Sequence, residues 1–167
     1  MFWFWNQKIR ALKKCIILFS FILFSCFSDF KNKKEEIDIY VKDLNNNSST
    51  LISSITEGSI LNKKETAVIG GFEFYEYFKS DKKELFKLEY IENTDKIYLE
   101  NYYFKKNKLI LVELVENFKK DSIPKLVYLN KIEVISTNIN NQQTIENLLY
   151  RGDFFLKNFL KLPYKPH

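Results

Sequence analysis

The spacing of apolar residues divides the chain into a helical start, a middle of alternating strands and a helical end. Between Glu35 and Leu44, apolar side chains recur three and four residues apart, which predicts a short amphipathic helix. Near the other end, one helical stripe contains Ile145, Leu148, Leu149, Leu156, Phe159 and Leu160. Thr144 is a suitable N-cap for this helix and Pro163 a suitable stop. Gly152 interrupts the stripe and weakens it by ~1 kcal/mol relative to Ala, which favours a kink there.

The middle of the chain changes to a period of two. Apolar and polar residues alternate over 72–78, 86–90 and 97–103, and polar turns separate these stretches. Residues 109–115 are apolar on both faces apart from one glutamate, which indicates a central strand. A last strand is expected over 125–135, directly after a proline, where that residue is tolerated. Short turns join these five expected strands, so the pattern predicts an antiparallel meander.

Together these elements predict an α+β fold with one antiparallel sheet of about five strands. The sheet is expected to pack against the C-terminal helix, and a short N-terminal helix precedes it. Residues 51–61 fit either a helical turn or an extended edge, and the sequence leaves both open.

The first 25 residues have the layout of a secretory signal peptide. Their basic residues, Lys8, Arg10, Lys13 and Lys14, precede an almost unbroken apolar run that ends at Phe24. As a helix, residues 15–25 would rise only ~16 Å, short of the ~30 Å hydrocarbon core, so an uncleaved spanning anchor is the weaker alternative. Four of the 26 basic residues lie in this leader. The remaining chain is therefore close to neutral, and no nucleic-acid partner is expected.

The sequence Leu23-Phe24-Ser25-Cys26 resembles a bacterial lipobox, although Phe24 is larger than the residue commonest at its position. The resemblance implies cleavage after Ser25 and attachment of a diacylglycerol to Cys26, which would anchor the chain to the membrane. The expected organisation is a removed signal peptide at 1–25, a lipidated tether at 26–34 and a single domain at 35–167. Cys26 would then be the only cysteine, so no disulfide is expected.

The order of these features resembles that of small Bacteroidota lipoproteins of uncharacterised function. These have an N-terminal helix, a strand hairpin similar to Tyr-Phe-Lys-Lys-Asn-Lys-Leu-Ile at 103–110, and a C-terminal helix. The resemblance covers roughly residues 15–161, and Lys108 stands where that hairpin usually has glycine. It implies a fold and a compartment, the bacterial envelope and in particular the outer membrane, but no activity.

Few side chains offer catalytic or metal-binding chemistry. The only histidine is His167, the last residue, so neither a histidine-based catalytic site nor a histidine metal site is expected. None of the four glycines forms a phosphate-binding loop, and no cofactor is predicted. The alternative of a hydrolase that uses carboxylates alone would need pairs such as Glu73 with Glu76 or Glu89 with Glu100. An Arg-Gly-Asp tripeptide falls within the predicted C-terminal helix rather than in an exposed loop.

Four tyrosines are the candidate partner-binding residues. Tyr75, Tyr77, Tyr98 and Tyr102 are expected to line the sheet face opposite the C-terminal helix. If that face is exposed, the rings would suit a peptide, a sugar or a partner protein. If both faces are covered, the rings belong to the core. The sequence therefore predicts a lipid-anchored, non-enzymatic binding or scaffolding domain. An immunity or inhibitor protein that binds its partner through this tyrosine face is a further alternative.

Overall fold

The computed structural model describes residues 30–79, 84–117 and 122–161. The N-terminal helix that the sequence predicts is confirmed, and residues 30–46 are helical. Helical structure thus reaches back into the segment for which a tether is expected. The chain divides after Glu36 into two units. The sheet and the second helix both belong to the unit that begins at Ile37.

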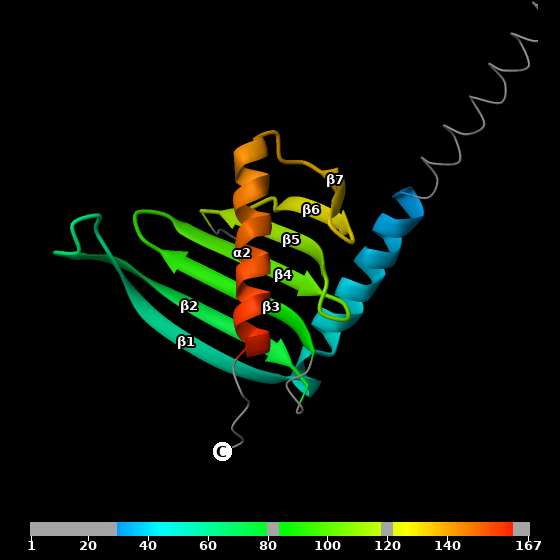
Figure 1. Ribbon diagram of the computed structural model, residues 1–167, viewed down its shortest axis with the longest axis horizontal. Coiled ribbons are helices and arrows are strands. Elements are labelled where there is room, and N and C mark those ends of the chain that lie inside the picture. Colours follow the sequence, from blue (N-terminus) through cyan, green and yellow to red (C-terminus); the bar gives the residue numbers. More distant parts are fainter. Residues whose placement is uncertain (1–29, 80–83, 118–121, 162–167) are drawn as a thin grey trace, which may run out of the picture. The chain divides into compact units, whose positions relative to one another are not determined.

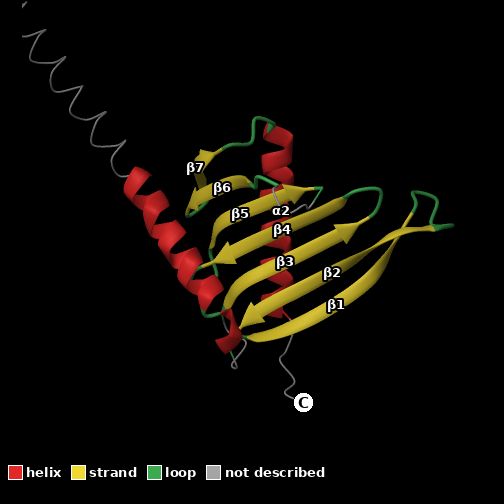
Figure 2. Cartoon of the chain, turned by 180° about the vertical axis from the view of Figure 1, so that it is seen from behind, coloured by secondary structure: helices red, strands yellow, loops and turns green. Residues whose placement is uncertain are grey.

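One antiparallel sheet dominates the described chain, with its strands side by side in sequence order (Figures 1 and 2). The strands are β1 (Ile52–Leu61), β2 (Val68–Phe78), β3 (Leu85–Asn93), β4 (Ile97–Phe104), β5 (Leu109–Glu116), β6 (Lys125–Asn130) and β7 (Glu133–Thr137). The predicted α+β class and the antiparallel meander are confirmed. The predicted number of strands is wrong, because the sheet has seven.

Two local features account for the additional strands. The residues that the sequence left open form β1, since they pair along β2 from Ile52 opposite Phe78 onwards. The last expected strand is split by a turn into β6 and β7. Lys131 in that turn has a φ of 62°, a left-handed conformation that reverses the chain. A period-two pattern does not reveal such a turn when the turn residues are themselves Lys and Ile.

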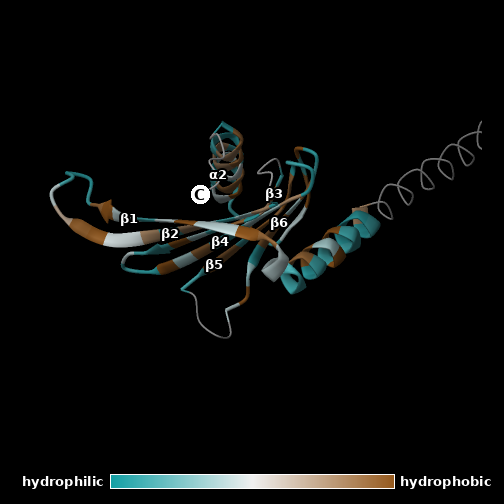
Figure 3. Cartoon of the chain, turned by 90° about the horizontal axis from the view of Figure 1, so that it is seen from below, coloured by the Kyte–Doolittle hydropathy of each residue, from teal (hydrophilic) through white to brown (hydrophobic). Residues whose placement is uncertain are grey.

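The helix α2 (Gln142–Lys161) crosses one face of the sheet, and the sheet curves beneath it (Figures 1 and 3). The predicted C-terminal helix is therefore confirmed. Its N-cap is Asn141 rather than Thr144, because the Asn141 side chain accepts a hydrogen bond of 3.0 Å from the Thr144 backbone N–H. Gly152 lies inside an unbroken helix. A Cβ at this position would come within 2.9 Å of the Tyr102 ring, so the glycine allows close packing on the sheet.

Pairing register decides which side chains face α2, since directly paired residues of neighbouring strands point to the same face. The core on this face contains Phe78, Leu88, Tyr102, Phe104, Val112, Leu148 and Phe159. On the opposite face, Ile37 and Val41 of the N-terminal helix pack against Tyr103, Leu111 and Tyr128. Two hydrogen bonds support this second contact. The Tyr40 hydroxyl donates to the Phe104 carbonyl oxygen at 2.9 Å, and the Tyr128 hydroxyl donates to Asp38 at 2.7 Å.

Candidate functional site

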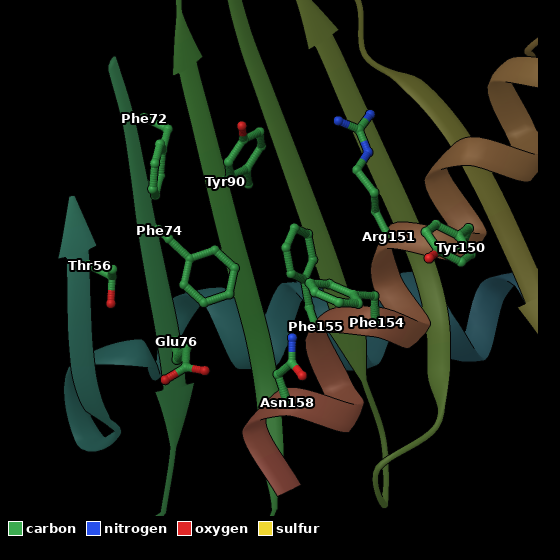
Figure 4. A pocket seen from close by; sticks show the side chains of 10 residues that line it. All are labelled: Thr56, Phe72, Phe74, Glu76, Tyr90, Tyr150, Arg151, Phe154, Phe155 and Asn158. Carbon is green, nitrogen blue, oxygen red and sulfur yellow. The ribbon is translucent and has the colours of Figure 1, made fainter. Parts of the chain in front are cut away.

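A groove of about 610 Å³ lies between α2 and the first three strands of the sheet. Its lining consists of Thr56, Phe72, Phe74, Glu76, Tyr90, Tyr150, Arg151, Phe154, Phe155 and Asn158 (Figure 4). We call it the aromatic groove, because most of its walls are rings. Its size and its mixture of rings with a few polar groups are typical of ligand-binding pockets in proteins.

Phe155 joins the helix wall of the aromatic groove to its sheet floor. Its ring centroid lies 4.9 Å from that of Phe74, 5.6 Å from that of Tyr102 and 6.0 Å from that of Tyr90. These separations are in the range at which tilted aromatic pairs attract one another. Phe154 is adjacent in sequence but stands at the edge of the groove, and 50% of it is exposed. The groove therefore has one phenylalanine, Phe155, that packs against the sheet and a second, Phe154, that is accessible to a ligand.

Arg151 of the aromatic groove belongs to an ion pair with the sheet. Arg151 of α2 pairs with Glu100 of β4, which is only 2% exposed. The Tyr102 hydroxyl also donates a hydrogen bond of 2.5 Å to Glu100. Burial raises the pKa of the Glu100 carboxyl, while Arg151 and the Tyr102 hydrogen bond oppose that change. The positive charge of Arg151 is thus already balanced by a buried carboxylate.

One acidic side chain, Glu76, lines the aromatic groove, and a second, Glu92, is hydrogen-bonded to Tyr90 of its lining. Glu76 accepts a hydrogen bond of 2.7 Å from the Ser54 hydroxyl of β1. The Tyr90 hydroxyl donates to Glu92 at 3.1 Å. Burial, followed by the charge of Glu92, raises the pKa of Tyr90 to about 12. Since Arg151 is already balanced, the polar groups around the groove leave it an excess of negative charge.

The strand β1 forms one edge of the sheet and runs beside the aromatic groove, to which it contributes Thr56. It is ten residues long and contains a single ionisable side chain, Glu57. Within the described chain, β1 pairs only with β2, so one side of its backbone has no partner strand. Proteins usually protect such edges with short strands, lysine or proline. The other edge, β7, is only five residues long.

The four candidate tyrosines do not share a face, so that expectation is wrong. Tyr75 and Tyr77 lie on the face opposite α2, whereas Tyr102 is fully buried in the core beneath α2. Tyr98 also packs against that core. The reason is register. Tyr102 pairs with Leu88, which in turn pairs with Glu76 of the aromatic groove, and paired residues point the same way.

Register also separates the carboxylate pairs considered from the sequence. Glu76 lines the aromatic groove, but Glu73 lies an odd number of residues away on the same strand and therefore points to the other face. Glu100 is buried beneath α2, and Glu89 is likewise on the opposite face, because it pairs with Asn101, the neighbour of Glu100. Neither pair can act on one substrate atom. The Arg-Gly-Asp tripeptide lies in α2, as predicted, with Asp153 paired to Lys157.

The predicted lipidation site, Cys26, and the single histidine, His167, lie outside the described residues. Within the described residues, no three His, Cys, Asp or Glu side chains are grouped so that they could hold a metal ion. No helix in that part of the chain is both long and apolar enough to span a membrane.

Sequence reasoning missed the residues that form the aromatic groove. Arg151 and Phe155 are four residues apart on α2, so the sequence alone indicates that they share a helix face. What they face depends on strand register, which the sequence does not supply.

Comparison with known proteins gives no relative. No protein-family model matches the chain, and no curated protein or solved structure matches it either.

Proposed function

We propose that this chain is a lipid-anchored, non-enzymatic binding protein of the bacterial envelope. We further propose that it captures an extended peptide segment of a partner along the open edge of β1, with alternate side chains of the peptide directed towards the aromatic groove. The observation that carries this proposal is the position of β1, an open edge strand that contributes Thr56 to a groove lined with aromatic rings.

An edge strand and an adjoining groove supply two complementary parts of peptide recognition. A peptide that adds to a sheet edge gains main-chain hydrogen bonds, and pockets for alternate side chains give specificity. Every second side chain of a strand added beside β1 would point to the α2 face. Those side chains would lie next to Thr56, and the longer ones would extend across it towards Phe74 and Phe154. A sugar or a lipid would leave the backbone groups of β1 unused.

The charges around the groove favour a basic peptide. Glu100 already balances Arg151, and Glu76 remains on the groove wall beside β1. A lysine or arginine at one of the peptide positions that point to the α2 face would therefore complement the site. In the expected ligand, every second side chain points to the α2 face, and at least one of these is basic while the others are apolar.

The proposal is tested by selecting peptides from a random twelve-residue library on the purified full-length protein. Affinities of the selected peptides are then measured for the wild type, Phe154→Ala and Leu160→Ala. Phe154 is 50% exposed and Leu160 52% exposed on the same helix, but only Phe154 lines the groove. Loss of a contacting aromatic side chain at an interface commonly costs about 1–2 kcal/mol, which is roughly a 5–30-fold weaker affinity.

The expected result is weaker binding to Phe154→Ala with unchanged binding to Leu160→Ala. A third variant, Glu76→Gln, should weaken only those peptides that contain a basic residue. Selection of no peptide, or equal binding by the two helix variants, would overturn the proposal.

The lipid anchor is tested separately in the producing cell. We expect the intact mass of the mature protein to begin at Cys26 with added acyl chains. We expect Cys26→Ala to lose both these chains and the membrane association. An unmodified precursor that stays in the membrane would contradict the anchor and leave the peptide site untouched.

A further inference from the structure

A second groove of about 610 Å³ lies along the other part of α2, beside β5 and β6. Its lining consists of Asn107, Lys108, Leu109, Leu129, Lys131, Ile132, Leu149, Gly152, Asp153 and Leu156. We call it the leucine groove. It differs from the aromatic groove in kind, because its walls are aliphatic and contain no ring. Aliphatic walls suit a flexible hydrocarbon chain.

Two hairpin turns bring lysines to the leucine groove. The strands β4 and β6 run in the same direction, so the turns that follow them lie at the same end of the sheet. Lys108 comes from the first turn and Lys131 from the second. Asn107 and Lys131 both have left-handed backbone conformations, with φ of 53° and 62°. The tight turns they form keep both lysines beside the groove rather than on long loops.

The charge at the leucine groove is positive in the described structure. Neither Lys108 nor Lys131 makes an ion pair with any described residue. The one acid in the lining, Asp153, pairs with Lys157 on the next turn of α2. Two exposed lysines therefore line the groove, and no carboxylate of the described residues pairs with them. This combination is complementary to a molecule that has a hydrocarbon chain and an anionic head.

We propose that the leucine groove binds a free long-chain fatty carboxylate. Its hydrocarbon chain lies among Leu109, Leu149 and Leu156, and its carboxylate lies between the two lysines. Each methylene group removed from water contributes about 0.8 kcal/mol, so a chain of a few carbons already gives measurable affinity. Ile132 is 88% exposed at the groove wall, and a bound chain would cover it. This proposal does not depend on the peptide proposal, because the two grooves share no lining residue.

The test uses isolated membranes that contain the full-length protein. They are incubated with a photoreactive, alkyne-tagged fatty acid or with its methyl ester, irradiated, and the labelled peptides are mapped. The double variant K108Q/K131Q is compared with K106Q, which removes a lysine from the same turn but not from the groove lining. A further variant, Ile132→Ser, tests the apolar wall at a position too exposed to affect folding.

We expect the acid to label α2 or the β4–β5 and β6–β7 turns, and excess palmitate to compete with it. Labelling should fall about tenfold or more in K108Q/K131Q, which corresponds to about 1.4 kcal/mol. It should also fall in Ile132→Ser and stay unchanged in K106Q and Phe154→Ala. Equal labelling by acid and ester, equal labelling of the double variant and K106Q, or labelling confined to other segments would overturn the proposal. A photoreactive anionic phospholipid is tested in parallel, and labelling by that probe alone would also overturn the proposal, in favour of contact with the membrane surface.

Discussion

Removal of the Arg151 charge should destabilise the fold through the carboxylate that it leaves behind. In Arg151→Met, the side chain keeps most of its apolar length, but Glu100 stays 2% exposed with no positive charge beside it. Removal of one partner of a buried ion pair typically lowers the free energy of unfolding by about 3–5 kcal/mol. Here the Arg151 side chain is 38% exposed and Tyr102 still donates to Glu100, so water and the hydrogen bond reduce the loss. We expect a loss of about 2–3 kcal/mol.

The matched control is the double variant E100Q/R151M. It removes both charges and leaves Tyr102 a neutral acceptor, so most of the lost stability should return. Urea unfolding followed by circular dichroism measures both variants. In thermal unfolding the single variant should melt about 6–15 °C lower than the wild type, given the usual entropy of unfolding of a domain this size.

The pH dependence gives an independent check. Burial already raises the pKa of Glu100 above its ordinary value of 4.5, and the loss of Arg151 raises it further. The folded protein then holds this proton more tightly than the unfolded chain. The stability that this proton contributes is therefore fully present below pH 4.5, and it is lost as the pH rises through the raised pKa of Glu100. The deficit of Arg151→Met should shrink on acidification. A loss below about 1 kcal/mol, or a double variant no more stable than the single one, would refute this account of the ion pair.

Three further predictions concern the fold. Gly152→Ala should destabilise by about 1–3 kcal/mol in urea unfolding despite the better helix propensity of alanine, because the new Cβ would come within 2.9 Å of the Tyr102 ring; greater stability would contradict this. Asn141→Ala should cost about 1 kcal/mol in the same assay through the lost N-cap, whereas Thr144→Ala should cost less. Stability should fall from pH 10 to about pH 12, because Tyr90 keeps its proton to a pKa of about 12 in the folded state while the unfolded chain releases it near 10. A pH titration of the free energy of unfolding checks the last point, and Tyr90→Phe should flatten the curve.

Helices and most strands could be predicted from sequence because each has its own period. The stripe from Ile145 to Leu160 and the alternation from Phe72 to Phe78 both depend on neighbours in the chain, and both correspond to real elements. The β6–β7 turn was missed because its reversal depends on the left-handed backbone of Lys131, for which a lysine gives no signal.

The candidate site was not predictable because it depends on relations between strands. The alternation within β4 indicates that Tyr98 and Tyr102 share a face. The alternation does not indicate which face of the sheet the two tyrosines occupy. A shift of the strand pairing by one residue would move both to the other face. The depth of Glu100 and the contact of Phe155 with Phe74 follow from the same register.

Hydrogen exchange of β1 with and without a selected peptide tests the central claim most directly. If the peptide adds to the sheet edge, the amides of Ile52–Leu61 that face away from β2 should exchange much more slowly in its presence. The amides of β7, at the other edge, should be unaffected. Unchanged exchange in β1 together with saturable binding would contradict the account.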